Sequence, residues 1–421
     1  MAKISTGIDF GTTNSTAAIT DIDGVRLVPL EATHTTIPTA LYFPGDSHKV
    51  YFGRDAVAQY IDGNSDGRLM RSIKRILGSP LMNTTGTKVG GQLLAFEEII
   101  KTFIRYLKEK IDSAAGMGIE NVVLGRPVHF RDNDPDGDHA AESQLRHIAI
   151  AAGFKNIEFQ FEPIAAAFAH ERLLSAEKLA CVLDIGGGTS DFTVIRLSPL
   201  LCNRMDRSAD VLASTGVRVG GNDFDKNLSL KSFMPEFGMG TKLTGSGKIL
   251  PMPSAPYFTL STWNEINDLY EWKSIKQIEK WLFQSKSPEK LERLFEIARQ
   301  RLGHKNLGIV EDTKIRLSDT AKVEIIMDFL SDNPVITATR KNFDAAISDS
   351  IMRIKKSIDI CLRQAFVTSG EIDLVILTGG STEIPRINEL ARAQFPNAEL
   401  SVSDKFSSVG MGLAYDSARK F

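Results

Sequence analysis

The sequence predicts an α/β protein of two lobes built on a repeated pattern. Two similar glycine-rich peptides, residues 7–15 and 183–191, lie 175 residues apart, and each pairs an aspartate with a glycine–threonine turn. Strand-like and helix-like segments alternate around them, which is typical of α/β folds. The chain of 421 residues is also longer than the ~250–300 residues at which one hydrophobic core tends to divide. We therefore expect two large lobes that each contribute one glycine turn.

Elements of the first half can be assigned in order. Residues 17–30 alternate and turn like a β-hairpin. Residues 95–111 carry one apolar stripe at three-to-four spacing, which predicts a helix. Residues 121–125 form a candidate for a short buried strand. Glu162 and Pro163 open a further helix, because the missing N–H of proline has no partner in a first turn in any case.

The same pattern restarts in the second half. Residues 179–184 and 192–197 are strand-like and flank the second glycine turn. Residues 373–382 add a third strand that ends in glycines. This recurrence favours a duplicated fold.

An acidic segment at 132–138 begins like a calcium-binding loop, with acids at its first, third and fifth positions. Its twelfth position holds Ser143 where that loop needs glutamate. We interpret the segment as an acidic loop that caps a helix from about Ala140.

The stretch 238–257 is rich in glycine and proline, and we expect an exposed loop there. Two helical segments follow, at 263–282 and 288–302. This region holds three tryptophans, which we interpret as core-facing side chains of a helical subdomain rather than as a partner surface. They are Trp263, Trp272 and Trp281.

Composition excludes some classes of partner. The 50 basic and 52 acidic residues give a formal net charge of −2, so no overall field draws the protein to nucleic acid or a membrane. Three scattered cysteines lack metal-ligand spacing and suit a reducing compartment. The first apolar stretch, 4–10, is short and contains Asp9, so we expect no signal peptide. No apolar run is long enough to span a membrane, and we expect a cytoplasmic protein.

The two glycine turns suit a polyphosphate. Glycine lets backbone N–H groups turn toward an anion, and the hydroxyls of Thr12, Thr13 and Thr189 add donors. Carboxylates would repel phosphate, so Asp9 and Asp184 require a cation between them and the ligand. Mg²⁺ fits, because it prefers oxygen ligands and bridges carboxylates to phosphates.

Motifs along most of the chain, about 1–230 and 290–420, occur in an order that resembles the nucleotide-binding part of the DnaK-like heat-shock chaperones, in the actin-like ATPase superfamily. Stand-alone YegD-like members are the most similar in character. The matching segments are 7–15, 73–78, 162–167, 183–191, 220–225 and 377–385. The resemblance implies a two-lobed actin-like α/β ATPase, a duplicated ribonuclease-H-like fold with inserted subdomains. It also implies a chaperone-like protein that binds ATP or ADP, hydrolyses ATP weakly and closes its lobes on Mg-nucleotide.

The resemblance implies a role for each matching residue. Asp9 and Asp184 would hold hydrated Mg²⁺, and Lys74 would reach the γ-phosphate and the attacking water. Glu162 and Asp191 would orient that water, and Thr189 belongs to the same catalytic group. Nucleotide contacts are implied for Gly11, Thr12, Thr13, Asn14, Gly186, Gly187, Gly188, Thr189, Gly220, Gly221, Glu296, Arg299, Gly379, Gly380, Ser381 and Asp404. These residue types agree with phosphoryl-transfer chemistry, in which a cation and a lysine offset the phosphoryl charge.

The adenine side departs from the family. Glu383 replaces the arginine that would stack on the base, and Gln300 and Gly303 replace expected residues near Arg299. Adenine selectivity and a degenerate pocket therefore stay open. No peptide-binding domain follows Phe421 in this sequence, so we expect chaperone work to need another surface or an unidentified client or co-chaperone protein.

We expect the first lobe at 1–172, with an inserted subdomain at 31–109, and the second at 178–421, with a partly helical subdomain at 222–303. Nucleotide would bind in the cleft between them. Two other functions stay open. One is a small-molecule kinase of the same superfamily, and the other is a nucleotide-gated interaction or filament module without enzyme activity.

Overall fold

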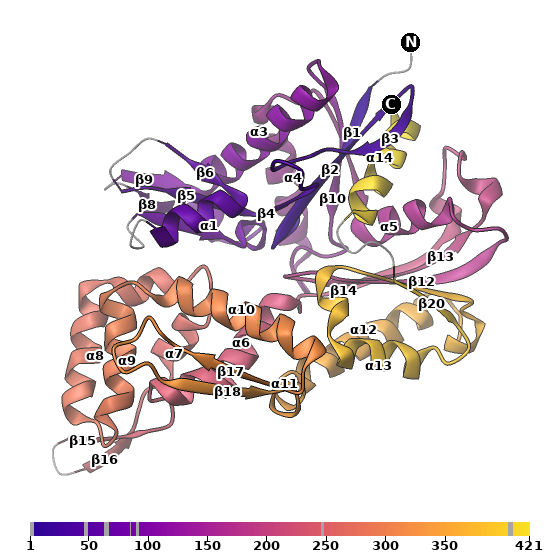
Figure 1. The fold of residues 1–421 in the computed structure, drawn as a ribbon. Coiled ribbons are helices and arrows are strands. Elements are labelled where there is room, and N and C mark those ends of the chain that lie inside the picture. Colours follow the sequence, from indigo (N-terminus) through magenta and orange to yellow (C-terminus); the bar gives the residue numbers. More distant parts are fainter. Residues whose placement is uncertain are drawn as a thin grey trace.

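The computed structural model describes residues 4–45, 49–62, 67–84, 86–89, 92–245, 248–402 and 407–421. It confirms the predicted two-lobed α/β fold. Two mixed sheets form the centres of the lobes, which lie one above the other in Figure 1. We call the lobe built on the N-terminal sheet the first lobe and the other the second lobe. The predicted residue limits of lobes and subdomains stay a proposal.

The two central sheets repeat one topology. The first has the order β3-β2-β1-β10-β11, with β4 beside β2, and the second has the order β14-β13-β12-β19-β20. In each order the first three strands pair antiparallel and the last three pair parallel. The first sheet contains β1 (Ser5–Asp9), β2 (Asn14–Asp21), β3 (Gly24–Leu27), β4 (Thr36–Pro38), β10 (Asn121–Arg126) and β11 (Asn156–Phe161). The second contains β12 (Lys178–Ile185), β13 (Ser190–Leu197), β14 (Val211–Val217), β19 (Leu374–Thr378) and β20 (Glu399–Val402).

Two helices cross between the sheets and join the lobes. Helix α5 (Glu162–Glu171) follows the first sheet but packs on β12 and β13 of the second. Helix α14 (Ser408–Lys420) follows the second sheet but packs on β1, β2 and α5 (Figure 1). A Cβ atom on Gly412 would lie 1.7 Å from the carbonyl oxygen of Ala165, so the helices touch backbone to backbone there. The two helices therefore form the packed connection between the lobes.

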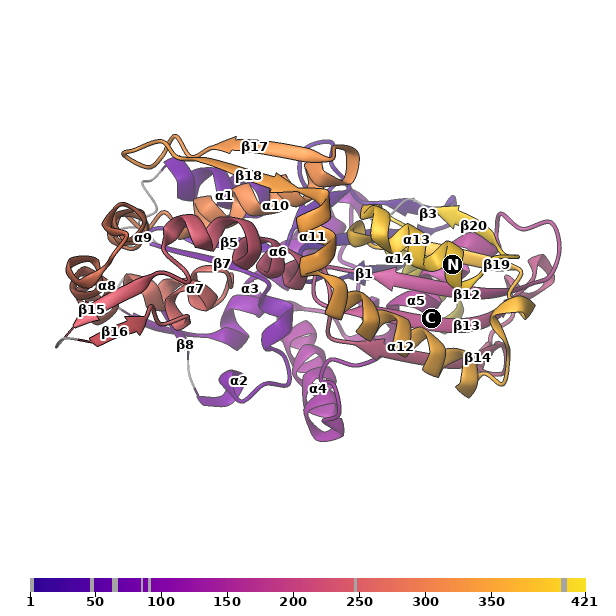
Figure 2. The ribbon, with the colours of Figure 1, turned by 90° about the horizontal axis from the view of Figure 1, so that it is seen from below.

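Further elements surround the sheets. The first lobe adds β5 (Ala40–Phe43), β6 (Tyr51–Phe52), α1 (Gly53–Asp62), β7 (Arg68–Arg71), α2 (Leu81–Thr84), β8 (Gly86–Val89), β9 (Gln92–Ala95), α3 (Phe96–Ala115) and α4 (Pro135–Ala152). The second adds α6 (Gly221–Leu228), β15 (Lys242–Gly245), β16 (Lys248–Pro251), α7 (Ala255–Leu260), α8 (Trp272–Gln284), α9 (Pro288–Arg299), α10 (Gly303–Asp319), β17 (Lys322–Ile326), β18 (Val335–Thr339), α11 (Arg340–Ala346), α12 (Ser348–Gln364) and α13 (Pro385–Gln394). Helices α2 and α4 lie on one side of the molecule and the β17–β18 hairpin on the other (Figure 2). None of the helices in the described part of the chain is long and apolar enough to cross a bilayer.

Most predicted elements are confirmed. The predicted hairpin at 17–30 is β2 and β3, although β3 ends already at Leu27. The predicted helix at 95–111 is α3, whose apolar stripe is buried in the core of the first lobe. The predicted strands at 121–125, 179–184 and 192–197 are β10, β12 and β13, and the strand in 373–382 is β19.

The secondary structure of residues 238–282 in the second lobe differs from the prediction. The expected loop at 238–257 contains the β15–β16 hairpin and the start of α7. The loop prediction was wrong because Leu243 and Met252 bury their side chains in the core of the second lobe, which pins both strands. The predicted helix at 263–282 begins only at Trp272, since Glu271 is extended (φ −65°, ψ 141°) and ends a short 3₁₀ turn, Ile266–Tyr270.

The three tryptophans do not share one environment. Trp263 is buried and Trp281 packs partly against the core, as expected. Trp272 is 69% exposed at the start of α8, so the core interpretation was wrong for this residue. The reason is its place in the first turn, which projects beyond the packed face of the helix.

The acidic loop at 132–138 caps a helix as predicted, but the helix begins at Pro135 rather than near Ala140. Asp134 is the N-cap and accepts a hydrogen bond from the backbone N–H of Gly137 at 3.0 Å. Asp138 accepts hydrogen bonds from the backbone of Phe130 and Arg131. The acids of this loop are therefore used to hold the local backbone.

Candidate functional site

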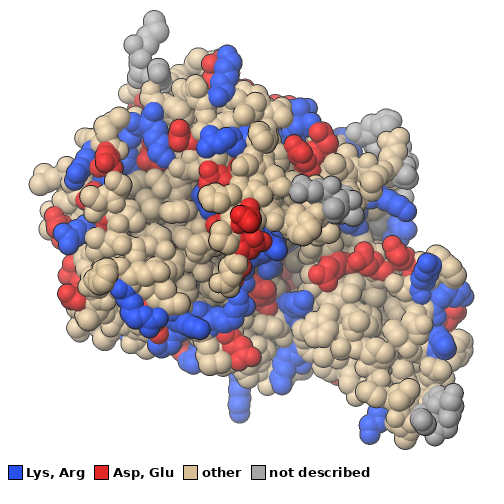
Figure 3. Space-filling model, turned by 180° about the vertical axis from the view of Figure 1, so that it is seen from behind, with Lys and Arg blue, Asp and Glu red and all other residues tan. Residues whose placement is uncertain are grey.

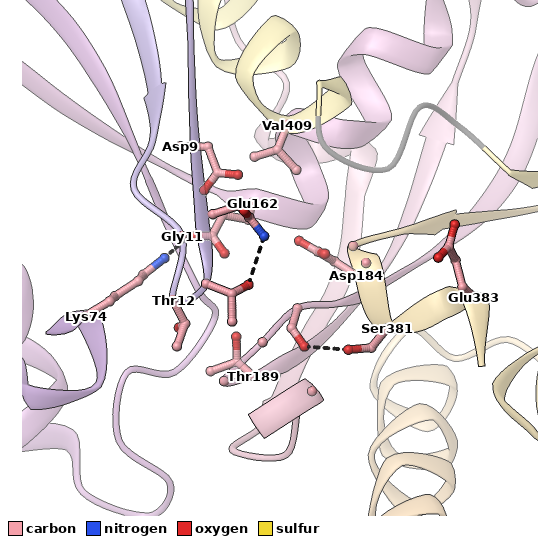
Figure 4. Close-up of a pocket in the computed structure, with 18 of the residues that line it drawn as sticks. Asp9, Gly11, Thr12, Lys74, Glu162, Asp184, Thr189, Ser381, Glu383 and Val409 are labelled. Carbon is pink, nitrogen blue, oxygen red and sulfur yellow. Dashed lines mark hydrogen bonds and ion pairs between the residues drawn. The ribbon is translucent and has the colours of Figure 1, made fainter. Parts of the chain in front are cut away.

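One pocket between the lobes collects most of the residues predicted to bind nucleotide (Figure 4). Asp9 and Asp184 stand at the ends of β1 and β12 and point into the pocket from opposite sides. The predicted residues that line it are Asp9, Gly11, Thr12, Thr13, Asn14, Lys74, Glu162, Asp184, Gly186, Gly187, Gly188, Thr189, Gly221, Gly379, Gly380 and Ser381.

The two glycine turns face each other at close range. The first joins β1 to β2, and the second joins β12 to β13, closed by a 2.9 Å hydrogen bond from the N–H of Gly186 to the carbonyl of Thr189. A Cβ atom on Gly187 would lie 2.2 Å from Cγ2 of Thr13, so only glycine permits this approach. The two glycine-rich peptides, residues 7–15 and 183–191, therefore form one continuous wall of the pocket.

Lys74 enters the pocket from a short 3₁₀ turn, Ile73–Ile76, which follows β7. Ser72 before it is left-handed (φ 57°) and redirects the chain toward the second lobe. The ammonium group of Lys74 forms a buried ion pair with Glu162, the first residue of α5. Burial acts to lower the pKa of Lys74, but the carboxylates of Glu162 and Asp9 outweigh it, so the pKa is raised and the side chain stays charged.

Carboxylates outnumber cations at this end of the pocket. Burial, reinforced by Glu162, raises the pKa of Asp9 to about 7 and that of Asp191 to about 8. The same causes raise the pKa of Asp184 well above its ordinary value. Burial makes the ionised carboxylates costly and Glu162 adds to that cost, so a bound cation would stabilise their charged forms.

The donor set fits a partly hydrated Mg²⁺. Among the described residues, no three carboxylate, imidazole or thiol side chains converge to hold a metal by themselves. Mg²⁺ tolerates this, because it keeps several waters and takes one or two carboxylates together with phosphate oxygens. Asp9 and Asp184 would supply those carboxylates.

Four of the predicted residues that the structure describes do not line the pocket: Asp191, Gly220, Glu296 and Arg299. Asp191 lies behind it, 1% exposed, and accepts a 2.8 Å hydrogen bond from the backbone N–H of Val128. Gly220 lies under the second glycine turn, while its neighbour Gly221 reaches the lining. Asp404 falls outside the described residues.

The structure places the two predicted residues of α9, Glu296 and Arg299, away from the pocket. Arg299 is exposed, and the carboxylate of Glu296 instead accepts hydrogen bonds from the backbone N–H and the hydroxyl of Ser331. Neither residue lines the pocket. The apolar face of α9 packs into the core of the second lobe, which turns its polar residues away from the cleft.

Helix α10 supplies the wall that α9 was expected to supply. Four of its residues lie at positions i, i+3, i+4 and i+7, on one face of the helix. They are Glu311, Lys314, Ile315 and Ser318. That spacing leaves a weak signal in the sequence, because it places an acid, a lysine, an isoleucine and a hydroxyl on one helical stripe. Glu383, noted as a departure, also lines the pocket, and Figure 4 shows it on the side of Asp184 and Ser381.

Glu311 connects the pocket to the first lobe. Its carboxylate pairs with the guanidinium of Arg71 at 3.0 Å, and the same guanidinium lies 4.1 Å from the ring centroid of Trp263. Burial acts to raise the pKa of Glu311, but Arg71 and Lys314 hold it below its ordinary value, so the group is ionised. Lys314 also pairs with Asp225 at 2.8 Å. A ligand beside Glu311 therefore bears on a contact between the lobes.

A second contact between the lobes involves His304, at the start of α10. Its Nδ1 shares a 2.9 Å hydrogen bond with the hydroxyl of Tyr60 on α1. The imidazole is 5% exposed and packs edge-on against the Tyr60 ring. Burial, aided by Arg68 and Arg71, lowers the pKa of His304 to about 3.

This shift predicts a loss of stability in acid. A histidine that is neutral in the folded state and has an ordinary pKa of ~6.5 when unfolded stabilises the fold above pH 6.5 and loses that contribution as the pH falls toward 3. Between pH 7 and pH 5 the free energy of unfolding should fall by about 2 kcal/mol more in the wild type than in His304→Gln. Urea unfolding at both pH values measures the difference.

The exposed His147 on α4 provides the control, since His147→Gln should keep the full pH dependence of the wild type. Equal pH dependence in the wild type and His304→Gln would contradict a buried neutral His304.

Comparisons with known proteins show what this chain is similar to in sequence. A family model described as "Hsp70 protein" matches residues 5–249 and 289–416. The mitochondrial heat shock 70 kDa protein of Dictyostelium discoideum is 25% identical over 435 residues, covering 97% of this chain and 56% of that protein. The chaperone protein DnaK of Mycoplasmopsis synoviae (strain 53) is 26% identical over 427 residues, covering 98% and 58%. The chain spans a little over half the length of these curated relatives.

Proposed function

The chain belongs to the Hsp70 protein family, and we propose that it binds ATP and ADP with Mg²⁺ in the cleft between its lobes, hydrolyses ATP slowly and works as a chaperone-like switch. One observation carries the proposal. Both glycine turns, the Lys74–Glu162 pair and the polar face of α10 line a single pocket. The glycine turns and Lys74 offer donors and positive charge for the phosphates, and the α10 face offers polar and apolar groups for the nucleoside.

The phosphates would lie between the two glycine turns. Backbone N–H groups and the hydroxyls of Thr12, Thr13 and Thr189 are the donors available there. Mg²⁺, when bound, would offset the phosphate charge next to Asp9 and Asp184. The raised pKa values of these aspartates support a site that gains stability from such a cation.

The nucleoside would lie against α10. Ile315 is 52% exposed at the pocket wall and offers an apolar surface to a flat base. Lys314 and Ser318 offer donors, and Glu311 offers an acceptor for sugar hydroxyls. Glu383 adds a further carboxylate to the pocket lining. The titration that tests the proposal therefore compares adenine with guanine nucleotides.

In the proposed hydrolysis, a water oxygen bonds to the γ-phosphorus while the bond to the bridging oxygen of ADP breaks. Glu162 would orient that water and take its proton, and Lys74 would offset the charge of the transferring group. Among the described residues the pocket lining contains Lys74 and Lys314 but no arginine. Because an arginine in the site accelerates phosphoryl transfer strongly in related chemistry, its lack here supports slow turnover.

Lobe closure would be the output of nucleotide binding. Glu311 faces the pocket and pairs with Arg71 across the lobes, so occupancy and closure share one side chain. The Tyr60–His304 hydrogen bond adds a contact that forms only when the lobes meet. We propose that this closure controls binding of a client or co-chaperone protein.

Calorimetric titration with Mg-ATP, Mg-ADP and Mg-GTP, followed by a phosphate-release assay on the same sample, tests the proposal. We expect tighter binding of the adenine nucleotides and slow release of phosphate without an added acceptor. No heat with any nucleotide would contradict nucleotide binding. Binding with no phosphate release would contradict hydrolysis and leave a switch that depends on occupancy.

A further inference from the structure

The segment between the two parts of the chain that match the family model forms a surface of its own. The model matches residues 5–249 and 289–416, so residues 250–288 lie between the matched parts. This segment forms α7, the 3₁₀ turn at Ile266–Tyr270 and α8, at the outer end of the second lobe (Figure 1). A site built from these elements alone is therefore an addition to the family pattern.

These three elements line a groove with a volume of about 320 Å³, which we call the α7–α8 groove. All the residues that line it lie within 255–281. Leu269, Ile278 and Trp281 give the groove an apolar lining, and Lys273 lines it as well. The groove therefore combines an apolar wall with a positive charge on α8.

Exposed aromatic side chains accompany the groove on its two helices. Phe258 on α7 is 41% exposed, and Trp272 and Phe283 on α8 are 69% and 84% exposed. Figure 3 shows this end of the molecule from behind, at lower right, as a broad uncharged area. Exposed apolar side chains gathered in this way are typical of a surface that another protein covers.

Two lysines on α8 give the groove a basic rim. Lys273 and Lys280 are exposed, and in the described part of the chain neither forms an ion pair with a carboxylate. Lys276 between them differs, because it pairs with Glu279 at 2.8 Å. Figure 3 shows basic side chains along the outer edge of this end of the second lobe. The rim therefore offers two positive charges to a partner.

The negative charge in the groove is placed differently. Asp268 lines the groove from the 3₁₀ turn. Burial, together with Glu271, raises the pKa of Asp268, and Arg68 of the first lobe opposes this rise. Acidic side chains gather along the edge of this end that faces the first lobe (Figure 3). The acidic and basic sides of the groove are thus separated, and only the basic side points away from the rest of the protein.

We propose that the α7–α8 groove binds an amphipathic helix of another protein. The apolar stripe of that helix would pack on Leu269, Ile278 and Trp281, and its acidic side chains would pair with Lys273 and Lys280. The inference goes beyond the proposed function, because binding in this groove does not depend on nucleotide.

The spacing of the two lysines favours a helix as the occupant. Lys273 and Lys280 lie seven residues apart on α8, which is two turns or about 10 Å along the helix axis. A helix that lies along α8 and carries two acids at the same spacing reaches both lysines at once. An amphipathic helix that lays its apolar face into a groove is a common mode of recognition.

Two synthetic helical peptides of about 18 residues, or five turns, test the proposal. Both carry one apolar stripe and a fluorophore, and beside the stripe one has two glutamates seven residues apart where the other has lysines. Fluorescence anisotropy with the full chain should show binding of the glutamate peptide at least ~10-fold tighter than of the lysine peptide. Lys273→Glu combined with Lys280→Glu should reverse this preference. Equal affinities in the wild type, or an unchanged preference in the double variant, would overturn the proposal.

A matched control reverses two exposed charges with the same spacing on another helix. Lys356→Glu combined with Arg363→Glu on α12 should leave both affinities as in the wild type. Thr259→Arg places a long charged side chain into the groove from α7 and should weaken the glutamate peptide by about 10-fold. Circular dichroism verifies that this variant is folded. Wild-type affinity in folded Thr259→Arg would mean that the peptide binds elsewhere.

Sedimentation velocity of the chain alone distinguishes a second copy from a different partner. We expect a monomer in the wild type and in the variant with both Lys273→Glu and Lys280→Glu. A wild-type dimer that this variant loses would place a second copy in the groove and would overturn the proposed partner.

Discussion

Replacing Lys74 with alanine is expected to lower the single-turnover rate of ATP cleavage by at least ~100-fold while Mg-ADP affinity stays within about threefold of the wild type. Lys74 is buried, pairs with Glu162 and lines the cleft. Its positive charge is therefore placed to act on the γ-phosphoryl group, which ADP lacks. Quenched-flow measurement with excess protein over ATP separates this effect from binding.

Glu162 is the partner of Lys74 in the ion pair, and Glu162→Gln keeps its shape. The rate of ATP cleavage should fall to a similar extent, because the amide cannot take a proton from water. Lys101→Ala, which replaces a partly exposed lysine on α3 that pairs with Glu98, is the control for general effects of removing a lysine. Removing one member of a buried ion pair also costs stability, so circular dichroism should verify that each variant is folded. Unchanged cleavage in a folded Lys74→Ala protein would contradict the assigned role.

The joint position of the two glycine turns in one pocket could be predicted because the residues of each turn are local in sequence. Each glycine turn carries its aspartate, its glycines and its threonines within nine consecutive residues. One short peptide therefore contains the residues that form one wall of the pocket. The approach of Gly187 to Thr13 and of Gly188 to Thr12 is long-range, and the repeated sheet topology places the two turns opposite each other. Because the two halves repeat one fold, the two short peptides were enough to predict that the glycine turns contact each other.

The nucleoside end could not be assigned by the same reasoning, because two neighbouring helices present an acid followed three residues later by a basic residue. In α9 these are Glu296 and Arg299, and in α10 they are Glu311 and Lys314. Which helix faces the cleft depends on which apolar face enters the core. That choice is set by contacts with distant elements and leaves only a weak trace in the sequence, the Ile315 and Ser318 that continue the α10 stripe.

The crossing of α5 and α14 is another feature that local patterns do not contain. Each helix packs on the sheet of the other lobe, and the two meet where Gly412 lies against Ala165. Small residues in a sequence are compatible with a close helix contact but do not name the partner. This contact between the lobes therefore forms only when both halves of the chain are folded together.

Replacing Glu311 with alanine is expected to weaken Mg-ADP binding by about 30- to 100-fold, which corresponds to about 2–3 kcal/mol. The substitution removes an acceptor from the pocket and also the carboxylate that pairs with Arg71 across the lobes. Arg71→Ala removes the second contact alone and should cost about 5- to 10-fold. Calorimetric titration of the two single variants and the double variant completes a double-mutant cycle.

If Arg71 acts through Glu311, the double variant should bind Mg-ADP as weakly as Glu311→Ala alone, because the arginine has lost its partner. Fully additive losses would contradict this coupling between occupancy and closure. Glu296→Ala is a matched control: it removes a glutamate with the same spacing to a basic residue, but from the helix that faces away from the cleft. Wild-type affinity in Glu296→Ala together with the loss in Glu311→Ala would locate the nucleoside on α10, whereas the opposite pattern would return it to α9.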